Sequence, residues 1–199
     1  MPLSHPIYVL RHGETEWNFE GRLQGTLDSP LTPRGRAQAA AQRGLLARFL
    51  PHQTGVACWS SPQGRAWSTA QIACADLGPI VPKSALVEVS LGDWQGRTVA
   101  EIEASPEGAG ALRDHAEMWK FHAPGGEDLG MLRARLKILL QGLDRPTVIV
   151  THGVTSRVLR LLALDLPMSD YTALPGGQGV VFAIDNGVQT RWGAAVEGD

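Results

Sequence analysis

The sequence lacks any apolar run long enough to cross a membrane. No stretch of the 199-residue chain approaches the ~18 consecutive apolar residues that a transmembrane helix needs. The first residues, MPLSHPIYVLRHGE, also lack the basic start and long apolar centre of a secretion signal. We therefore expect a cytoplasmic protein without a membrane partner.

Charge of one sign and cysteine are also scarce. The formal net charge is −2, without the basic excess that contact with nucleic-acid phosphates needs, so no nucleic-acid partner is expected. The two cysteines, Cys58 and Cys74, are too few for a disulfide framework and have no CxxC spacing, so we interpret them as reduced core thiols. Repeats and linker-like segments are missing too. We expect one domain over residues 1–199, with the last few residues flexible.

Short β-type runs alternate with longer helical patterns along the chain. Thr32-Pro33 and Ser61-Pro62 each pair a good N-cap with proline at the first helical position, which predicts a helix start at both places. The alternation predicts an α/β fold whose mostly parallel sheet is covered by helices on both faces, ending in a hairpin at Asp185-Asn186-Gly187. The expected strands are Ile7–Leu10, Val56–Ser60, Leu86–Val89, Thr147–Thr151, Gly179–Ile184 and Val188–Trp192.

Polar side chains stand where several of these strands end. Arg11 and His12 follow the first strand, Arg65 follows the second, and His152 follows the strand that ends at Thr151. Glu88 lies near the end of a further expected strand. Because ligands of parallel α/β sheets bind beyond the carboxyl ends of the strands, we expect these side chains to meet in one site.

Such a set has the chemistry to handle phosphate. Two guanidinium groups can each grip two oxygens of one anion, and glycines after both histidines let backbone N–H groups approach the same oxygens. One imidazole can attack phosphorus if it is neutral, which nearby arginines favour, while its other nitrogen bonds a main-chain carbonyl. The second imidazole can serve as a cation or as a hydrogen-bond donor. A protonated Glu88 can supply the leaving group with a proton and later take one from water.

The ordered motifs resemble a known family. LRHGETEWN, SSPQGRAWSTA, LVEVSLGDWQG and VTHGV, with RLQGTLDSPLTPRGRAQA and PGGED between them, are similar to the histidine phosphatase superfamily, in the branch named for cofactor-dependent phosphoglycerate mutase. The resemblance runs from about residue 6 to 160 and implies a three-layer α/β/α sandwich of about six strands. It implies that His12 is the phosphorylated nucleophile and Glu88 the proton donor, with Arg11, Arg65 and His152 around the phosphate.

The same resemblance suggests residues that contact the substrate. Asn18 is expected to contact phosphate, with Gln24 and Gly25 nearer the rest of the substrate, and we add Thr15 and Gly153 to this group. No cofactor and no metal is expected. A homodimer is compatible with the sequence.

The branch within the family decides the reaction. Residues 89–151 contain no Arg-Arg pair of the kind that holds the carboxylate in mutases, and GDWQG is similar to the phosphatase-like members. We expect a phosphomonoester hydrolase that acts on a small phosphorylated metabolite. A cofactor-dependent mutase-type phosphotransferase and a non-catalytic phosphate-binding module remain the alternatives.

Residues 97–125 match no pattern that assigns them a role. Trp119, Lys120, Phe121 and His122 there either border the leaving-group pocket or form the packed aromatic face of a short helix. Other phosphate chemistries lack their motifs: GxxxxGK[ST], a DxD pair and GxSxG are all missing. A zinc hydrolase built from His12, Glu88 and His152 is disfavoured because two arginines in the pocket would repel the cation.

Overall fold

Six strands form a single sheet in the computed structural model, which describes residues 3–50 and 55–194. The strand order is β3-β2-β4-β1-β5-β6; the first four are mutually parallel, β5 is antiparallel to β1, and β6 is antiparallel to β5. The mostly parallel sheet of about six strands is thereby confirmed. The expectation for the last few residues falls outside the described part of the chain. The strands are β1 Ile7–Arg11, β2 Ala57–Ser60, β3 Ile80–Pro82, β4 Thr147–Thr151, β5 Val181–Asp185 and β6 Val188–Trp192.

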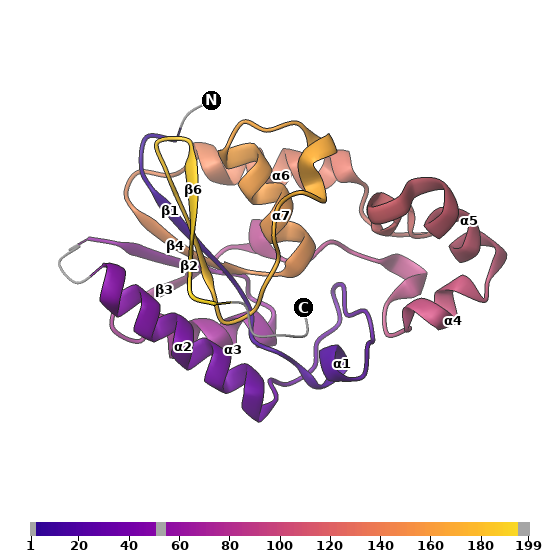
Figure 1. Cartoon of the computed structure of the whole chain (residues 1–199), viewed down its shortest axis with the longest axis horizontal. Helices are drawn as coiled ribbons and strands as arrows, with labels where there is room; N and C mark the ends of the chain where they lie inside the picture. Colours follow the sequence, from indigo (N-terminus) through magenta and orange to yellow (C-terminus); the bar gives the residue numbers. More distant parts are fainter. Residues whose placement is uncertain (1–2, 51–54, 195–199) are drawn as a thin grey trace.

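Helices cover both faces of the sheet (Figure 1). Helices α2 (Pro33–Phe49) and α3 (Gly64–Ala73) pack together on one face, and α6 (Leu129–Gln141) and α7 (Gly153–Ala163) pack on the other. Side chains alternate between these faces along β1. Ile7 and Val9 enter one apolar cluster, whereas Tyr8 and Leu10 enter the other. This confirms the three-layer sandwich.

A group of short helices projects beyond the sheet, to the right in Figure 1. Helices α4 and α5 form its outer part, and the 3-10 helix η3 leads the chain back towards α6. The remaining elements are α1 Glu16–Phe19, η1 Ser84–Leu86, η2 Gly92–Trp94, α4 Val99–Glu103, α5 Pro106–His115, η3 Ala116–His122 and η4 Met168–Tyr171. Among the helices of the described residues, none has the length and apolar character to cross a membrane.

The segment 86–89 is not a strand, so that prediction was wrong. Its carbonyl groups bond side chains: Arg135 donates to the carbonyl of Val87 at 2.9 Å, and the Thr151 hydroxyl donates to that of Leu86 at 2.7 Å. Those carbonyls are therefore not available to a neighbouring strand. The edge of the sheet is formed by β3 instead, a three-residue strand that follows Pro79 and ends at Pro82.

Local helix signals gave one correct start and one wrong one. The Thr32 hydroxyl caps α2 by accepting a hydrogen bond from the N–H of Gly35 at 3.0 Å, as predicted. Helix α3 begins at Gly64 rather than at the residue after Ser61, whose hydroxyl is hydrogen-bonded to His152 at 2.8 Å. The terminal hairpin is confirmed, with Asn186 and Gly187 both in the left-handed region that its tight turn requires.

Candidate active site

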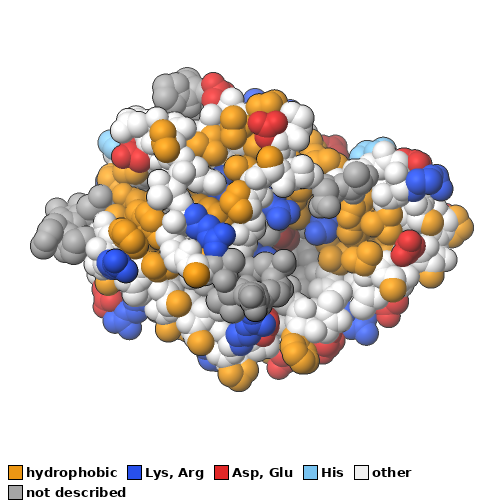
Figure 2. Space-filling model, viewed as in Figure 1, with side chains coloured by type: hydrophobic (Ala, Val, Ile, Leu, Met, Phe, Trp, Pro, Cys, Tyr) orange, Lys and Arg blue, Asp and Glu red, His pale blue; other side chains and the backbone are white. Residues whose placement is uncertain are grey.

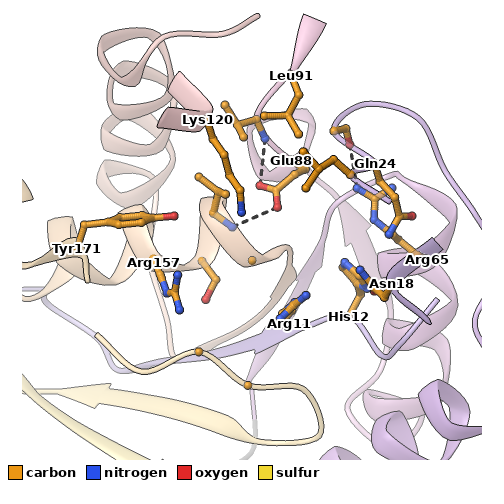
Figure 3. Close-up of a pocket in the computed structure, with 18 of the residues that line it drawn as sticks. Arg11, His12, Asn18, Gln24, Arg65, Glu88, Leu91, Lys120, Arg157 and Tyr171 are labelled. Atoms are coloured by element: carbon orange, nitrogen blue, oxygen red, sulfur yellow. Dashed lines mark hydrogen bonds between the residues drawn. The ribbon is translucent and has the colours of Figure 1, made fainter. Parts of the chain in front are cut away.

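A cleft of about 160 Å³ opens at the carboxyl ends of β1 and β4. Figure 2 shows Lys and Arg side chains gathered around the hollow in this face of the molecule. Its lining includes the expected Arg11, His12, Arg65 and Glu88. Figure 3 shows these four side chains directed towards one another: Arg11 and His12 follow each other in the chain, and Arg65 and Glu88 come from two other segments.

Two adjacent parallel strands bring the two histidines together. Arg11 pairs with Thr151 in the β1–β4 register, and the N–H of His12 donates to the Thr151 carbonyl at 2.9 Å. His12 and His152 therefore leave the sheet side by side, with ring centroids 5.2 Å apart and planes at 59°. Both are buried.

The ring of His12 has one nitrogen fixed and one available. Its Nδ1 lies 2.7 Å from the carbonyl oxygen of Gly13. Because a carbonyl can only accept, Nδ1 is the donor of this hydrogen bond. This confirms the expected main-chain acceptor and places the lone pair on Nε2. Burial lowers the pKa of His12 well below its usual value, and the charges of Arg65 and Arg11 lower it further. The neutral imidazole that nucleophilic attack needs is therefore the favoured form.

His152 lies behind His12 rather than in the cleft lining. Its Nε2 is 2.8 Å from the hydroxyl of Ser61, and its buried Nδ1 has no hydrogen-bond partner in the described part of the chain. Burial, followed by the charge of Arg65, lowers the pKa of His152 well below its usual value. Of the two roles proposed from the sequence, the neutral donor is therefore favoured over the cation.

Arg65 is held by the loop of residues 25–28. Its guanidinium donates to the Gly25 carbonyl at 2.9 Å and to the Leu27 carbonyl at 2.6 Å, and it forms an ion pair of 3.0 Å with Asp28. Burial lowers the pKa of Arg65, while hydrogen bonding to Asp28 and the charge of Glu88 oppose that shift. These contacts place the arginine firmly beside both histidines.

Gly13 has a different role from the one predicted. Its N–H donates to the hydroxyl of Thr69 at 3.0 Å, so it is not directed at a bound phosphate. A Cβ at Gly13 would lie 2.2 Å from the carbonyl oxygen of Gly35 at the start of α2. This glycine is needed because the backbone after β1 packs directly on the backbone of that helix.

Glu88 occupies the N-terminus of α7. Its Oε1 accepts hydrogen bonds from the N–H of Val89 at 3.0 Å, from the N–H of Thr155 at 3.0 Å and from the Thr155 hydroxyl at 2.8 Å. Its Oε2 accepts one hydrogen bond, from the N–H of Val154 at 3.1 Å. Among the described residues, Oε1 thus accepts three hydrogen bonds and Oε2 one. A Cβ at Gly153 would lie 3.8 Å from this oxygen and 3.5 Å from the Arg11 Nε.

The expected substrate-binding residues of the α1 region divide into a lining pair and a support. Asn18 and Gln24 line the cleft, whereas Thr15 does not. The Thr15 hydroxyl accepts hydrogen bonds from the Asn18 backbone at 3.2 Å and from the Gln24 amide at 2.8 Å. Thr15 is therefore a positioning residue for the other two.

Gln63 is a site residue that sequence reasoning missed. Its side-chain amide donates to the Gly25 carbonyl at 2.9 Å, and its Oε1 accepts from the N–H of Glu88 at 2.7 Å. Gly25 lines the cleft and has a φ of 55°, a conformation that favours glycine. A single glutamine at a helix start has no local signature, so only the neighbouring motif could have drawn attention to it.

The aromatic segment near residue 120 contributes one side chain to the cleft. Lys120 lines it, but Trp119 and Phe121 are buried in the core. The ring of Trp119 packs against that of Trp94, with centroids 5.5 Å apart. His122 is exposed and does not line the cleft. Of the two alternatives, the packed aromatic face therefore explains most of this segment, and only Lys120 borders the pocket.

Metal chemistry lacks a ligand set in the residues described. No group of three or more His, Cys, Asp or Glu side chains is placed to hold a metal ion among residues 3–50 and 55–194. Cys58 and Cys74 are buried free thiols in the core, as predicted.

Fold and site together define a class of protein. It is an α/β domain with a cationic cleft at the carboxyl ends of its central strands, suited to a phosphate group next to a neutral imidazole. A family model covers residues 7–188 of this sequence. The chain belongs to the histidine phosphatase superfamily, branch 1.

Relatives and solved structures agree with this assignment. A glucosyl-3-phosphoglycerate phosphatase of Mycobacterium tuberculosis is 35% identical over 187 residues, covering 87% of this chain and 81% of the relative. Phosphoserine phosphatase 1 of Hydrogenobacter thermophilus is 33% identical over 172 residues, covering 83% and 79%. The structure of YhfR from Bacillus stearothermophilus matches with a TM-score of 0.77 and 32% identity over 98% of both chains.

Proposed function

We propose that this protein hydrolyses phosphomonoesters of small metabolites through a phosphohistidine on His12. The observation that carries the proposal is the setting of the His12 ring: it is buried and its Nδ1 is fixed on the Gly13 carbonyl, which leaves Nε2 as the nucleophile. Burial also lowers the pKa of His12, which favours the neutral form. The named substrates of the relatives, a glucosyl-3-phosphoglycerate and phosphoserine, are themselves phosphomonoesters of small metabolites.

In the first step, Nε2 of His12 forms a bond to phosphorus as the ester P–O bond breaks. Arg11 and Arg65, which line the cleft, hold the charge of the phosphoryl oxygens during transfer. His152 is outside the lining, and we assign it the role of a neutral hydrogen-bond donor next to His12, whose ring is 5.2 Å away. Glu88 gives the proton on its Oε2 to the departing alkoxide. The products of this step are the free alcohol and phosphohistidine.

In the second step, water attacks phosphorus and the N–P bond breaks. The carboxylate of Glu88 takes a proton from that water, which restores the proton spent in the first step. Inorganic phosphate leaves and His12 is again neutral. Water as the acceptor accords with the lack of an Arg-Arg pair in residues 89–151.

A screen of phosphomonoesters with wild type and His12→Ala tests the proposal, with His122→Ala, an exposed histidine, as the matched control. We expect phosphate release from several esters with wild type and His122→Ala, and loss of release with His12→Ala. Acid-labile ³²P should appear on wild type during turnover and be absent from His12→Ala. Release undiminished in His12→Ala would overturn the nucleophile, and the absence of both release and labelling would favour a phosphate-binding module.

The mutase alternative is tested in the same screen with 3-phosphoglycerate, in the presence and absence of 2,3-bisphosphoglycerate. We expect phosphate release that does not depend on the bisphosphate. Bisphosphate-dependent isomerisation at a far higher rate than hydrolysis would overturn the phosphatase assignment.

A further inference from the structure

The cleft continues beyond the proposed reaction centre to a second end. In Figure 3, Tyr171 and Arg157 lie on the left and His12, Asn18 and Arg65 on the right, with Glu88 between them. The left-hand end is built from α7 and η4, while the Lys120 side chain extends from η3 towards the middle of the view, near Glu88. Different elements thus form the two ends.

Positive charge exceeds negative charge along the described lining. Glu88 is its one acidic residue, set against six cationic ones. Arg65 forms an ion pair with Asp28, and Arg22 forms ion pairs with Glu20 and Glu101, all three carboxylates lying outside the lining. The six are Arg11, Arg22, Arg65, Lys120, Arg157 and Arg160.

Arg157 has no carboxylate partner within the described part of the chain. Its guanidinium lies over the ring of Tyr171, with Cζ 5.4 Å from the ring centroid, and its buried Nε has no hydrogen-bond partner there. A Cβ at Gly176 would lie 3.1 Å from one of its terminal nitrogens, so the glycine leaves the guanidinium room on that side. The planar fork is oriented by a stacked ring and is open to a ligand.

The neighbouring Arg160 illustrates the contrast. It donates to Gln189 at 3.0 Å and to the Pro175 carbonyl at 2.7 Å, and it lies 3.9 Å from the centroid of Phe182. Both terminal nitrogens of Arg160 thus donate within the protein, although its Nε, like that of Arg157, has no partner among the described residues. Arg157, one helical turn earlier on α7, has no comparable hydrogen bonds from its terminal nitrogens in the part of the chain that the structure describes.

We propose that Arg157 binds a carboxylate on the leaving group of the phosphate ester. The proposal rests on the proposed function, because it concerns the part of the substrate that the phosphate end does not hold. An arginine fork matches the two oxygens of a carboxylate, and Arg157 lines the cleft at this end. An ester without this group would leave the Arg157 fork without an anion when the bound substrate excludes water.

Two matched ester pairs test the assignment, because each pair differs by the carboxylate. These are 3-phosphoglycerate against glycerol 3-phosphate, and phosphoserine against phosphoethanolamine. With Arg157→Met, which removes the guanidinium but keeps an unbranched apolar side chain on α7, we expect kcat/KM for the carboxylated esters to fall about 10- to 100-fold, mostly through KM. The carboxylate-free esters should change less than about twofold, and Arg157→Lys should restore part of the loss.

Arg145→Met is the matched control. Arg145 is exposed, pairs with Asp144, and precedes the amino end of β4, whereas the cleft lies at the carboxyl end of that strand. It should leave both members of each pair unchanged. Equal losses on both members in Arg157→Met would overturn the carboxylate site, as would a wild type that does not prefer the carboxylated esters. A preference for 1,3-propanediol bisphosphate over 3-phosphoglycerate would assign the second end to phosphate and equally overturn the proposal.

Calorimetry separates this proposal from the proposed function. If wild type binds 3-phosphoglycerate more tightly than glycerol 3-phosphate and Arg157→Met removes the difference, the second site stands even where no ester is hydrolysed. If esters are hydrolysed through His12 but neither binding nor kcat/KM responds to the carboxylate, the second site fails alone.

Discussion

The rings of His12 and His152 lie side by side with centroids 5.2 Å apart, and burial, followed by the charge of Arg65, lowers the pKa of both. Two imidazoles this close to a buried guanidinium favour their neutral forms, since protonation of either would add a positive charge to a cleft that already has an excess.

Activity should therefore persist on the acid side of neutrality. His12 has to be neutral to attack phosphorus, and its pKa lies well below the usual 6.5, so kcat/KM should not fall with the protonation of an ordinary histidine. A pH profile on one ester, corrected for the titration of the ester phosphate, measures this. An acid limb with a midpoint at or above pH 6.5 would contradict the neutral-nucleophile assignment.

The same two histidines should make stability depend on pH. Between pH 6.5 and their lowered folded-state pKa values, the unfolded chain binds protons that the folded chain does not, so the free energy of unfolding falls as pH falls. Each histidine contributes about 1.4 kcal/mol per pH unit in that window and nothing above it. Urea unfolding of wild type and His152→Asn from pH 7.5 to 5 should show a shallower slope for the variant. Equal slopes would mean that His152 is protonated in the folded state.

Replacing Glu88 should slow the enzyme in a way that depends on the leaving group. Glu88→Gln keeps an acceptor for the N–H of Thr155 but cannot give a proton, so alkyl esters should lose about 10²- to 10⁴-fold in kcat. An aryl ester such as p-nitrophenyl phosphate, whose phenolate leaves without protonation, should lose far less. Equal losses on the two esters would argue against Glu88 as the acid.

Alanine at the two glycines that follow the histidines should have opposite effects. Gly13→Ala places a Cβ 2.2 Å from the Gly35 carbonyl, backbone against backbone, and should destabilise the fold by about 1–3 kcal/mol or more. Gly153→Ala meets Arg11 and Glu88 at ordinary contact distance, so it should fold normally while turnover falls. Thermal unfolding together with steady-state rates distinguishes the two, and a stable, fully active Gly13→Ala would refute the packing argument.

Local patterns were sufficient for the strands and residues around the nucleophile. An apolar run that ends in Arg11-His12-Gly13, and a second that ends before His152, predicted which side chains meet because parallel strands share one carboxyl edge. The segment 86–89 was misread because its conformation depends on Arg135 and Thr151, residues distant in sequence. Such side-chain contacts leave no trace in hydrophobic periodicity.

The second end of the cleft could not be predicted for a related reason. Arg157 looks like any polar residue on an amphipathic helix, and only the fold places it over Tyr171 at one end of the cleft. Gln63 is similar, since its two hydrogen bonds join loops that are 38 and 25 residues away in the chain. The motifs identify the reacting atoms, whereas the groups that surround them are set by tertiary structure.

The strand ends and the short helices beyond them meet in the cleft without sharing elements. His12 directly follows β1 in the middle of the sheet, while Lys120 and Tyr171 belong to η3 and η4. A change in these helices can therefore alter which ester is accepted without moving the nucleophile. Transplanting η3 and η4 from a relative with another preference is a direct route to a new specificity on an unchanged catalytic centre.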